Sequence, residues 1–265
     1  MDTVQAVDLA LVQGLSEFLP VSSSGHLILL PHFLGWADQG LAFDVAVHVG
    51  TLAALVAYFR REIASMASAW LGSVFGGRHT PDSRLAWQVL VGTVPVGLTG
   101  MLAGDWIESH LRDPLFVAGT LSFFGLLMYA ADRWSRGTRS EFELGWGPAV
   151  AIGCAQALAL LPGTSRSGIT MTAGRALGLS RSGAARFSFL LAIPGIGAAG
   201  AYECLKVASA GVALDWSAIA LGVACSAAAG LACIHFLIRF IERIGLLPFT
   251  IYRLLLAAVI VWHFG

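Results

Sequence analysis

The sequence predicts an all-α integral membrane protein with an inverted-topology repeat, built from six transmembrane helices and two re-entrant helical hairpins. Three observations lead to this fold class: an apolar composition, six long apolar runs, and two similar segments that are each broken by proline, glycine and serine. Of the 265 residues, 57% are hydrophobic and 12% are charged, and the mean hydropathy is +0.76. This composition is too apolar for a water-soluble domain of that length. The partner that we expect is the membrane bilayer, and the net charge of zero gives no reason to expect a nucleic-acid partner.

Six apolar runs are long enough to cross a hydrocarbon layer of about 30 Å as helices. They comprise residues 42–60, 84–104, 115–133, 183–203, 216–238 and 248–264. The longest connection, about 61–83, is polar and Gly-rich, and we expect a cytoplasmic link there rather than a site. The chain is therefore expected to form one membrane domain, 1–265.

Two other regions, 3–34 and 147–178, are broken midway by proline and glycine amid serines, which leaves arms too short to span a bilayer. Irregular backbone at membrane depth is tolerated only where protein or a cavity satisfies it, so each region is predicted to be a re-entrant helical hairpin with its tip at the break. Three spans follow each hairpin, and because three is odd the second copy is inverted relative to the first. The two repeats are accordingly predicted at 1–135 and 145–265.

The arginines predict the orientation. If the chain starts outside, the outside-facing loops hold only Arg112 and Lys206, whereas the inside-facing segments hold twelve arginines. These twelve are Arg60, Arg61, Arg78, Arg84, Arg133, Arg136, Arg139, Arg175, Arg181, Arg186, Arg239 and Arg243. The positive-inside rule then places both termini outside.

The two broken regions align with each other without a gap at an offset of 143 residues. Identical residues occupy the pairs Gln13 and Gln156, Leu15 and Leu158, Ser22 and Ser165, Ser24 and Ser167, and Gly25 and Gly168. The chemistry differs at three other pairs: Glu17 and Leu160, Ser23 and Arg166, and His26 and Ile169. One copy thus offers a carboxylate and an imidazole and the other a guanidinium, which is what an anion-processing site assembled from both would need.

A charge near the bilayer centre costs about 2.5 to 3.5 kcal/mol even on the lenient insertion scale, so Glu17 and Arg166 need partners. A structural ion pair between them is the simpler alternative, but it does not explain why both lie among serines and glycines. Gly25, Gly163 and Gly168 allow close backbone approach, and helix N-termini after each break would direct free N–H groups at the tips. Because a guanidinium can bind phosphate oxygens bidentately, the tips are interpreted as an anion cradle.

Gln13 and Glu17 are four residues apart and share one helix face. Their oxygens suit a hard divalent cation, Mg²⁺ or Ca²⁺, so Glu17 is the candidate metal ligand. His26 begins the returning arm and could act as general base or nucleophile. Ser23 is a second candidate nucleophile because it aligns with the phosphate clamp, Arg166.

The remaining polar residues have weaker assignments. Ser22 and Ser24 either bind substrate or cap helices. Asp44 and His48 are four apart, and structural pairing between them is favoured over a role in lining the cavity. Asp8 is an intramembrane acid to which the sequence assigns no partner.

Three motifs resemble the undecaprenyl-diphosphate phosphatase family, also called the bacitracin-resistance or BacA family. They are Gln-x-x-x-Glu at 13–17, Phe-Leu-Pro-Val-Ser-Ser-Ser-Gly-His at 18–26 and Pro-Gly-x-Ser-Arg-Ser-x-x-Thr at 162–170. Residues 187–194 and 248–253 extend the resemblance over essentially the whole chain. The family has Glu or Gln at the first motif position, and here it is Gln13, which argues against an essential proton donor at that position.

The resemblance implies an enzyme that hydrolyses the C55 isoprenyl diphosphate to the monophosphate at the outer face of the bacterial inner membrane. This reaction recycles the lipid carrier for peptidoglycan synthesis and gives bacitracin resistance. On this basis Arg166 holds the diphosphate, and Glu17 orients the reacting group or helps to hold a cation. The attacking group stays open between Ser23, His26 and a water activated by Glu17. The implied substrate-binding residues are Gln13, Ser22, Ser24, Gly25, Gly163, Ser165, Ser167 and Thr170, with an apolar groove beside the hairpins for the prenyl chain.

Two other functions share features with this sequence. A polyprenyl-phosphate flippase fits the repeat architecture, which is typical of transporters, but would bind phosphate without needing Ser23 or His26. Type-2 phosphatidic-acid phosphatases also use Ser-Gly-His, here residues 24–26, but their Lys-x6-Arg-Pro and Arg-x5-His-x3-Asp motifs are absent. The sequence allows a homodimer without deciding the oligomeric state.

Overall fold

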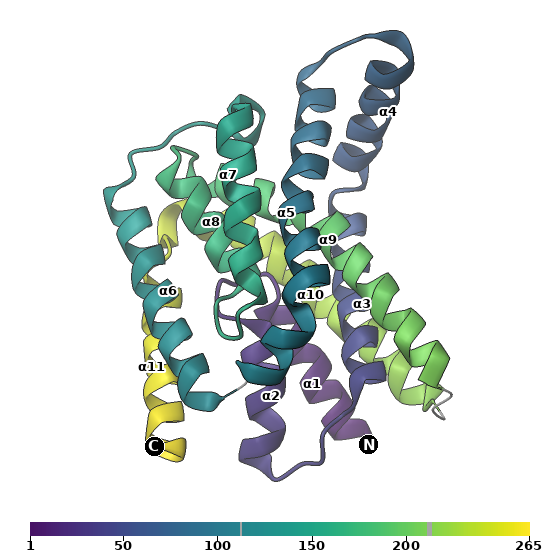
Figure 1. Cartoon of the computed structure of the whole chain (residues 1–265), viewed down its shortest axis with the longest axis vertical. Helices are drawn as coiled ribbons and strands as arrows, with labels where there is room; N and C mark the ends of the chain where they lie inside the picture. Colours follow the sequence, from purple (N-terminus) through teal and green to yellow (C-terminus); the bar gives the residue numbers. More distant parts are fainter. Residues whose placement is uncertain (112, 211–213) are drawn as a thin grey trace.

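The computed structural model describes residues 1–111, 113–210 and 214–265, so Arg112, used above for the orientation, lies outside the described residues. The described part is helical, with no β-strand beyond one isolated bridge between Arg139 and Leu179. Both termini lie at the same end of the molecule (Figure 1). The predicted all-α fold is confirmed.

Within the described ranges, six helices are long and apolar enough to cross a membrane, in agreement with the six predicted spans. They are α3 (Leu41–Tyr58), α5 (Pro81–His110), α6 (Pro114–Trp134), α9 (Arg181–Ala210), α10 (Trp216–Ile244) and α11 (Leu247–Phe264). The protein is therefore a multi-pass membrane protein. Its orientation in the membrane stays a prediction.

The expected link at 61–83 is largely a helix, α4 (Arg60–Gly76), which projects with the start of α5 beyond the other helices (Figure 1). The apolar residues Ile63, Met66 and Trp70 recur along α4 at helical spacing. The centroid of the Trp70 ring lies 5.6 Å from that of Trp87 on α5. Trp87 also donates a hydrogen bond to Ser73 over 3.1 Å. The helix was missed because its serines and glycines hide a short apolar stripe.

The two broken regions form pairs of short helices. The first pair is α1 (Thr3–Ser16) and α2 (Ser23–Leu34), and the second is α7 (Trp146–Ala157) and α8 (Arg166–Ala176), with a 3₁₀ turn at Leu158–Leu160 after α7. The longest arm has 14 residues, about 21 Å of helix, which is too short for a bilayer. The pairs enter from opposite ends and their turns meet near the middle (Figure 1). Their re-entrant placement in a bilayer and the repeat boundaries 1–135 and 145–265 stay predictions.

Glycines let α1 and α3 lie directly on α10. A Cβ at Gly14 of α1 would lie 2.7 Å from the Ser226 carbonyl oxygen, and one at Gly50 of α3 would lie 2.5 Å from the Val223 carbonyl oxygen. Small residues of this kind allow close helix packing in membranes. The packing holds the first hairpin against the long helices, with Phe18 at its tip completely buried and edge-on to Phe189 of α9 at 5.5 Å.

The remaining described element is a 3₁₀ turn at Glu141–Glu143, between α6 and α7. At the same end of the molecule, Asp132 near the end of α6 accepts hydrogen bonds from the side chains of Arg175 and Arg181. Ion pairs at 3.0 and 2.8 Å thus join the ends of α6 and α8 to the start of α9, at the end of α8 opposite to the second tip.

Candidate active site

The first tip gathers two polar side chains around one carboxylate. Glu17 directly follows α1 and is buried. Gln13, one turn earlier, donates its amide to Glu17 Oε2 over 3.1 Å. Ser23, the first residue of α2, donates its hydroxyl to the same oxygen over 2.7 Å. The turn between the two helices therefore places a serine hydroxyl on a carboxylate that is shielded from solvent.

The second tip supplies the counter-charge. Arg166 is the first residue of α8, and its Nη2 donates to Glu17 Oε1 over 2.8 Å across 149 residues of sequence. Its Nη1 donates to the Ser188 carbonyl of α9 over 3.2 Å. Ser23 and Arg166, which are equivalent in the internal alignment, thus meet at the two oxygens of one carboxylate.

The backbone repeats the same strained conformation at both tips. Ser22 (φ 74°) and Ser165 (φ 70°) are the non-glycine residues with positive φ in the part of the chain that the structure describes. They are equivalent at the offset of 143 residues, and each directly precedes the returning helix. A left-handed serine costs roughly 1–2 kcal/mol, and such strain is concentrated at functional sites. The tips also touch, because Ser167 donates its hydroxyl to the Leu19 carbonyl over 3.1 Å.

His26 lies apart from the carboxylate. Its Nδ1 is 2.7 Å from the Ser22 carbonyl oxygen, and because a carbonyl can only accept, Nδ1 carries the proton. Nε2 therefore accepts from the Tyr252 hydroxyl of α11 at 2.5 Å, and the two rings stack with centroids 5.5 Å apart. The Ser23 hydroxyl bonds to Glu17, so the structure contains no Ser23–His26 hydrogen bond.

His48 of α3 faces the site. Its Nε2 is 3.9 Å from Glu17 Oε2, while Nδ1 is 2.8 Å from the Asp44 backbone carbonyl. The Asp44 carboxylate accepts from Gln39 over 2.8 Å. His48 thus bonds to the backbone of Asp44 and also lines the site. The expected pairing of the Asp44 and His48 side chains stays a prediction.

Most hydroxyls of the second tip are engaged with protein groups. Ser165 accepts from the Gly168 N–H over 3.2 Å as a helix cap. Thr170 donates to the Arg166 carbonyl over 2.8 Å and lies 2.7 Å from the Ser188 hydroxyl. Serine and threonine in helices often bond to backbone in this way. Their direct contact with substrate stays a prediction.

The remaining predicted site residues, Ser24, Gly25 and Gly163, differ in their exposure to solvent. Ser24 is exposed and lies 3.4 Å from the Ser22 hydroxyl, whereas Gly25 is buried at the start of α2. Gly163 of the second tip is buried and has a φ of 87°. A Cβ there would lie 2.7 Å from the Val117 carbonyl, so the site requires glycine for close packing against α6.

The first tip offers few side-chain ligands for a metal ion. In the described ranges, no group of three or more His, Cys, Asp or Glu side chains could hold a metal ion. Gln13 Oε1, however, is buried without a hydrogen-bond partner, and Glu17 is adjacent. Two hard oxygen ligands suit Mg²⁺, which usually takes one or two protein ligands beside phosphate oxygens and water. They suit Ca²⁺ less well, since it takes six to eight oxygens.

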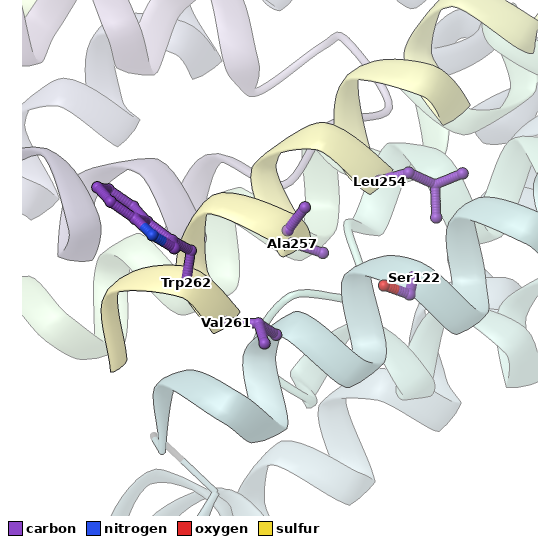
Figure 2. Close-up of a pocket in the computed structure, with 6 residues that line it drawn as sticks. Ser122, Leu254, Ala257, Val261 and Trp262 are labelled. Atoms are coloured by element: carbon purple, nitrogen blue, oxygen red, sulfur yellow. The ribbon is translucent and has the colours of Figure 1, made fainter. Parts of the chain in front are cut away.

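An apolar groove of about 410 Å³ lies between α6 and α11 (Figure 2). Its lining residues are Ser122, Leu254, Ala257, Ala258, Val261 and Trp262. The groove begins on α11 directly after Tyr252 and Arg253, but Glu17, Ser23 and Arg166 do not line it. It therefore suits an apolar chain rather than a charged head group.

Sequence reasoning missed or underrated three residues of the site: His48, Ser188 and Tyr252. Ser188 and Tyr252 lie inside the segments 187–194 and 248–253, which carried the family resemblance without an assigned role. A polar side chain in the middle of an apolar span was the available signal. The helix that each one meets could not be inferred from that signal.

The fold and site define a class: a multi-pass α-helical membrane protein in which two facing helix pairs build one carboxylate–hydroxyl–guanidinium site. Over residues 6–259 the sequence matches the family described as Bacitracin resistance protein BacA. The chain belongs to this family.

Similar proteins cover the chain from end to end. Undecaprenyl-diphosphatase 2 of Stutzerimonas stutzeri (strain A1501) is 56% identical over 268 residues, which cover 100% of this chain and 99% of that protein. An undecaprenyl-diphosphatase of Nitrosococcus oceani is 53% identical, with 100% of both chains covered. One of Teredinibacter turnerae is 51% identical, with 98% of both covered. The family resemblance seen in the motifs is confirmed.

Proposed function

We propose that this protein hydrolyses undecaprenyl diphosphate to undecaprenyl phosphate and inorganic phosphate. It is a phosphatase, a hydrolase acting on a diphosphate anhydride. The observation that carries the proposal is the meeting of Ser23 and Arg166 on Glu17, in a chain whose relatives of equal length are named undecaprenyl-diphosphatases.

Arg166 binds the diphosphate. In the structure its guanidinium is held by Glu17 and the Ser188 carbonyl, so it is ordered before substrate arrives. When the diphosphate binds, its oxygens replace some of these protein acceptors, and the planar guanidinium donates to two phosphate oxygens. Charge that develops on the transferring phosphoryl group is stabilised by this fixed cation, which is the main source of catalysis in phosphoryl transfer.

Ser23 is the nucleophile that the geometry favours. Its hydroxyl already donates to Glu17, so Glu17 accepts the proton as Ser23 Oγ attacks the terminal phosphorus. The bond from that phosphorus to the bridging oxygen breaks, and undecaprenyl phosphate leaves with the electron pair. Water then hydrolyses the phosphoserine to inorganic phosphate. His26 is the weaker candidate because Tyr252 engages its Nε2.

Gln13 and Glu17 would hold Mg²⁺ together with diphosphate oxygens. The unpartnered Gln13 Oε1 and the adjacent carboxylate support this assignment. When bound, the ion neutralises negative charge on the diphosphate. The proton transfer and the attack remain with Glu17 and Ser23.

On this proposal the site lies in the bacterial inner (plasma) membrane, with both termini outside and the site open to the outer face. The twelve arginines on the segments predicted to face inside support this orientation. There the reaction recycles the lipid carrier for cell-wall synthesis. The family description supports the link to bacitracin resistance. Part of the prenyl chain occupies the groove between α6 and α11. A homodimer, which the sequence allows, is not required, since one chain supplies both helix pairs.

The proposal is tested by measuring inorganic phosphate released from undecaprenyl diphosphate by the purified protein in detergent, with and without chelator. We expect metal-dependent release that falls about 10²–10³-fold in Arg166→Ala and Glu17→Gln, as when a charged transition-state contact is lost. Ser209→Ala serves as the control and should keep its activity, because the exposed Ser209 hydroxyl near the end of α9 bonds to the Lys206 carbonyl of the same helix. Folded wild-type protein that binds the lipid without releasing phosphate would overturn the proposal in favour of a flippase.

A further inference from the structure

A buried arginine contacts both hairpin tips. Arg253 lies in the apolar helix α11 and is completely buried. Its guanidinium donates to five backbone carbonyl oxygens: Leu121 at 3.1 Å, Thr164 and Gly163 at 3.0 Å, and Pro20 and Thr120 at 3.5 Å. A guanidinium has five N–H donors, so every donor is used.

The acceptors belong to three separate elements. Pro20 lies in the turn of the first tip, Gly163 and Thr164 lie in the turn of the second, and Thr120 and Leu121 lie on α6. Backbone carbonyls in a broken helix have no helical partner, and inside a membrane protein each needs a donor. One side chain therefore satisfies both broken turns at once and connects them to α6.

The surroundings are shaped for this side chain. A Cβ at Gly125 would lie 3.3 Å from Arg253 Nε, and one at Gly168 would lie 3.0 Å from Nη1. Two glycines on different helices thus leave the space that the guanidinium fills. The guanidinium is also held entirely by neutral carbonyls in the hydrogen bonds found within the described residues. A charged group placed this way in a membrane protein is costly, which favours a functional role.

We propose that Arg253 is a positioning residue for the proposed reaction. It holds the two tips in the register at which Ser23 and Arg166 both reach Glu17. The planar, five-donor geometry explains why arginine occupies the position, because lysine offers three donors from one point and could not connect both tips and α6. This inference rests on the proposed function for its kinetic test, but its structural test is independent of activity.

The structural test uses hydrogen exchange measured by mass spectrometry on the full chain in detergent without substrate. The variants are Arg253→Lys and Arg253→Gln. We expect amide exchange in peptides covering residues 17–24 and 161–168 to rise about 10-fold or more, with α3 and α10 unchanged. Gly125→Ala crowds Arg253 without removing it, and should raise exchange at the same peptides by a smaller factor even if the other variants fail to fold.

Arg175→Lys is the matched control. Arg175 is also buried and donates to backbone carbonyls, including that of Ser135 at 3.1 Å. It differs in that it pairs with Asp132 near the end of α8, away from the tips. This variant should leave exchange at both tips as in the wild type.

The kinetic test is a double-mutant cycle of Arg253→Lys with Arg166→Lys. If Arg253 acts through the placement of Arg166, Arg253→Lys should lower kcat about 10-fold in the wild type and less than about 3-fold when Arg166 is already changed. The effect of Arg175→Lys should multiply with that of Arg166→Lys.

Wild-type exchange at both tips in the Arg253 variants, or fully multiplicative kinetic effects, would overturn the inference. Absence of phosphate release by the wild type would instead overturn the proposed function, while the exchange measurement would still test whether Arg253 holds the tips.

Discussion

The two hairpin tips have the same backbone but use their side chains differently. Both place a serine with positive φ before the returning helix. At the first tip, Glu17 and Ser23 direct their polar atoms into the site. At the second, Ser165 caps a helix and Ser167 bonds to the backbone of the other tip, while Arg166 pairs with the Glu17 carboxylate. The same backbone thus carries two different functions: the first tip, with Glu17 and Ser23, is the reactive tip, and the second, with Ser165 and Ser167, is the holding tip. A few side chains make the difference.

The largest expected effect comes from a substitution at the reactive tip. Ser23→Ala should lower kcat about 10³-fold or more, because it removes the attacking oxygen, while the dissociation constant for the lipid stays within about 3-fold. Phosphate release and lipid binding in detergent measure the two quantities. Ser16→Ala, in the same hairpin, is the control and should retain most activity, because the Ser16 hydroxyl donates to the Val12 carbonyl within α1. Equal losses in both variants would contradict the assignment of Ser23.

His26→Gln separates the two candidate nucleophiles of the same tip. We expect kcat to fall only about 10-fold, since His26 bonds to Tyr252 and to the Ser22 carbonyl rather than to Glu17. Tyr252→Phe should cost less than about 3-fold. A loss from His26→Gln as large as that from Ser23→Ala would move the nucleophile to the imidazole.

Ser167→Ala tests the holding tip. The variant leaves the Leu19 carbonyl without its donor and should cost about 1 kcal/mol, a fall of about 2–4 °C in the midpoint of thermal unfolding. Thermal unfolding in detergent measures this shift. Ser122→Ala is the control, because that hydroxyl only bonds within its own helix. An unchanged midpoint would show that Ser167 does not stabilise the contact between the tips. An activity loss comparable to that of Ser23→Ala would show that Ser167 acts in the reaction itself.

The smallest effect concerns the strain that both tips share. Ser22→Gly relieves the left-handed strain but makes the unfolded chain more flexible, and because these terms nearly cancel the midpoint should stay within about 2 °C. Ser22→Ala keeps the strain and loses the hydroxyl, so its midpoint should be lower than that of the glycine variant. The same order is expected for Ser165→Gly and Ser165→Ala. A glycine variant less stable than the alanine variant would mean that the positive φ is not a strained state.

Much of the fold could be predicted because membrane spans leave a strong signal. A bilayer demands about 20 consecutive apolar residues, and all six such runs became helices. The helix α4 was missed because its 17 residues are not a long apolar run, and its stripe of Ile63, Met66 and Trp70 is interrupted by serine and alanine. The two charged residues of the site could also be predicted, because Glu17 and Arg166 are charges in apolar surroundings.

The sequence by itself determined where the helices break, which side chains lie at the breaks, and that the two broken regions are copies. These properties are local: proline and glycine interrupt helices, and alignment needs no coordinates. Only the tertiary structure decided that His48 faces Glu17, that Tyr252 engages His26, and that Arg253 connects the two turns. A span in lipid is apolar on all sides, so its pattern does not mark the face that packs inward. Which distant helix each polar side chain meets is therefore decided by how the helices pack.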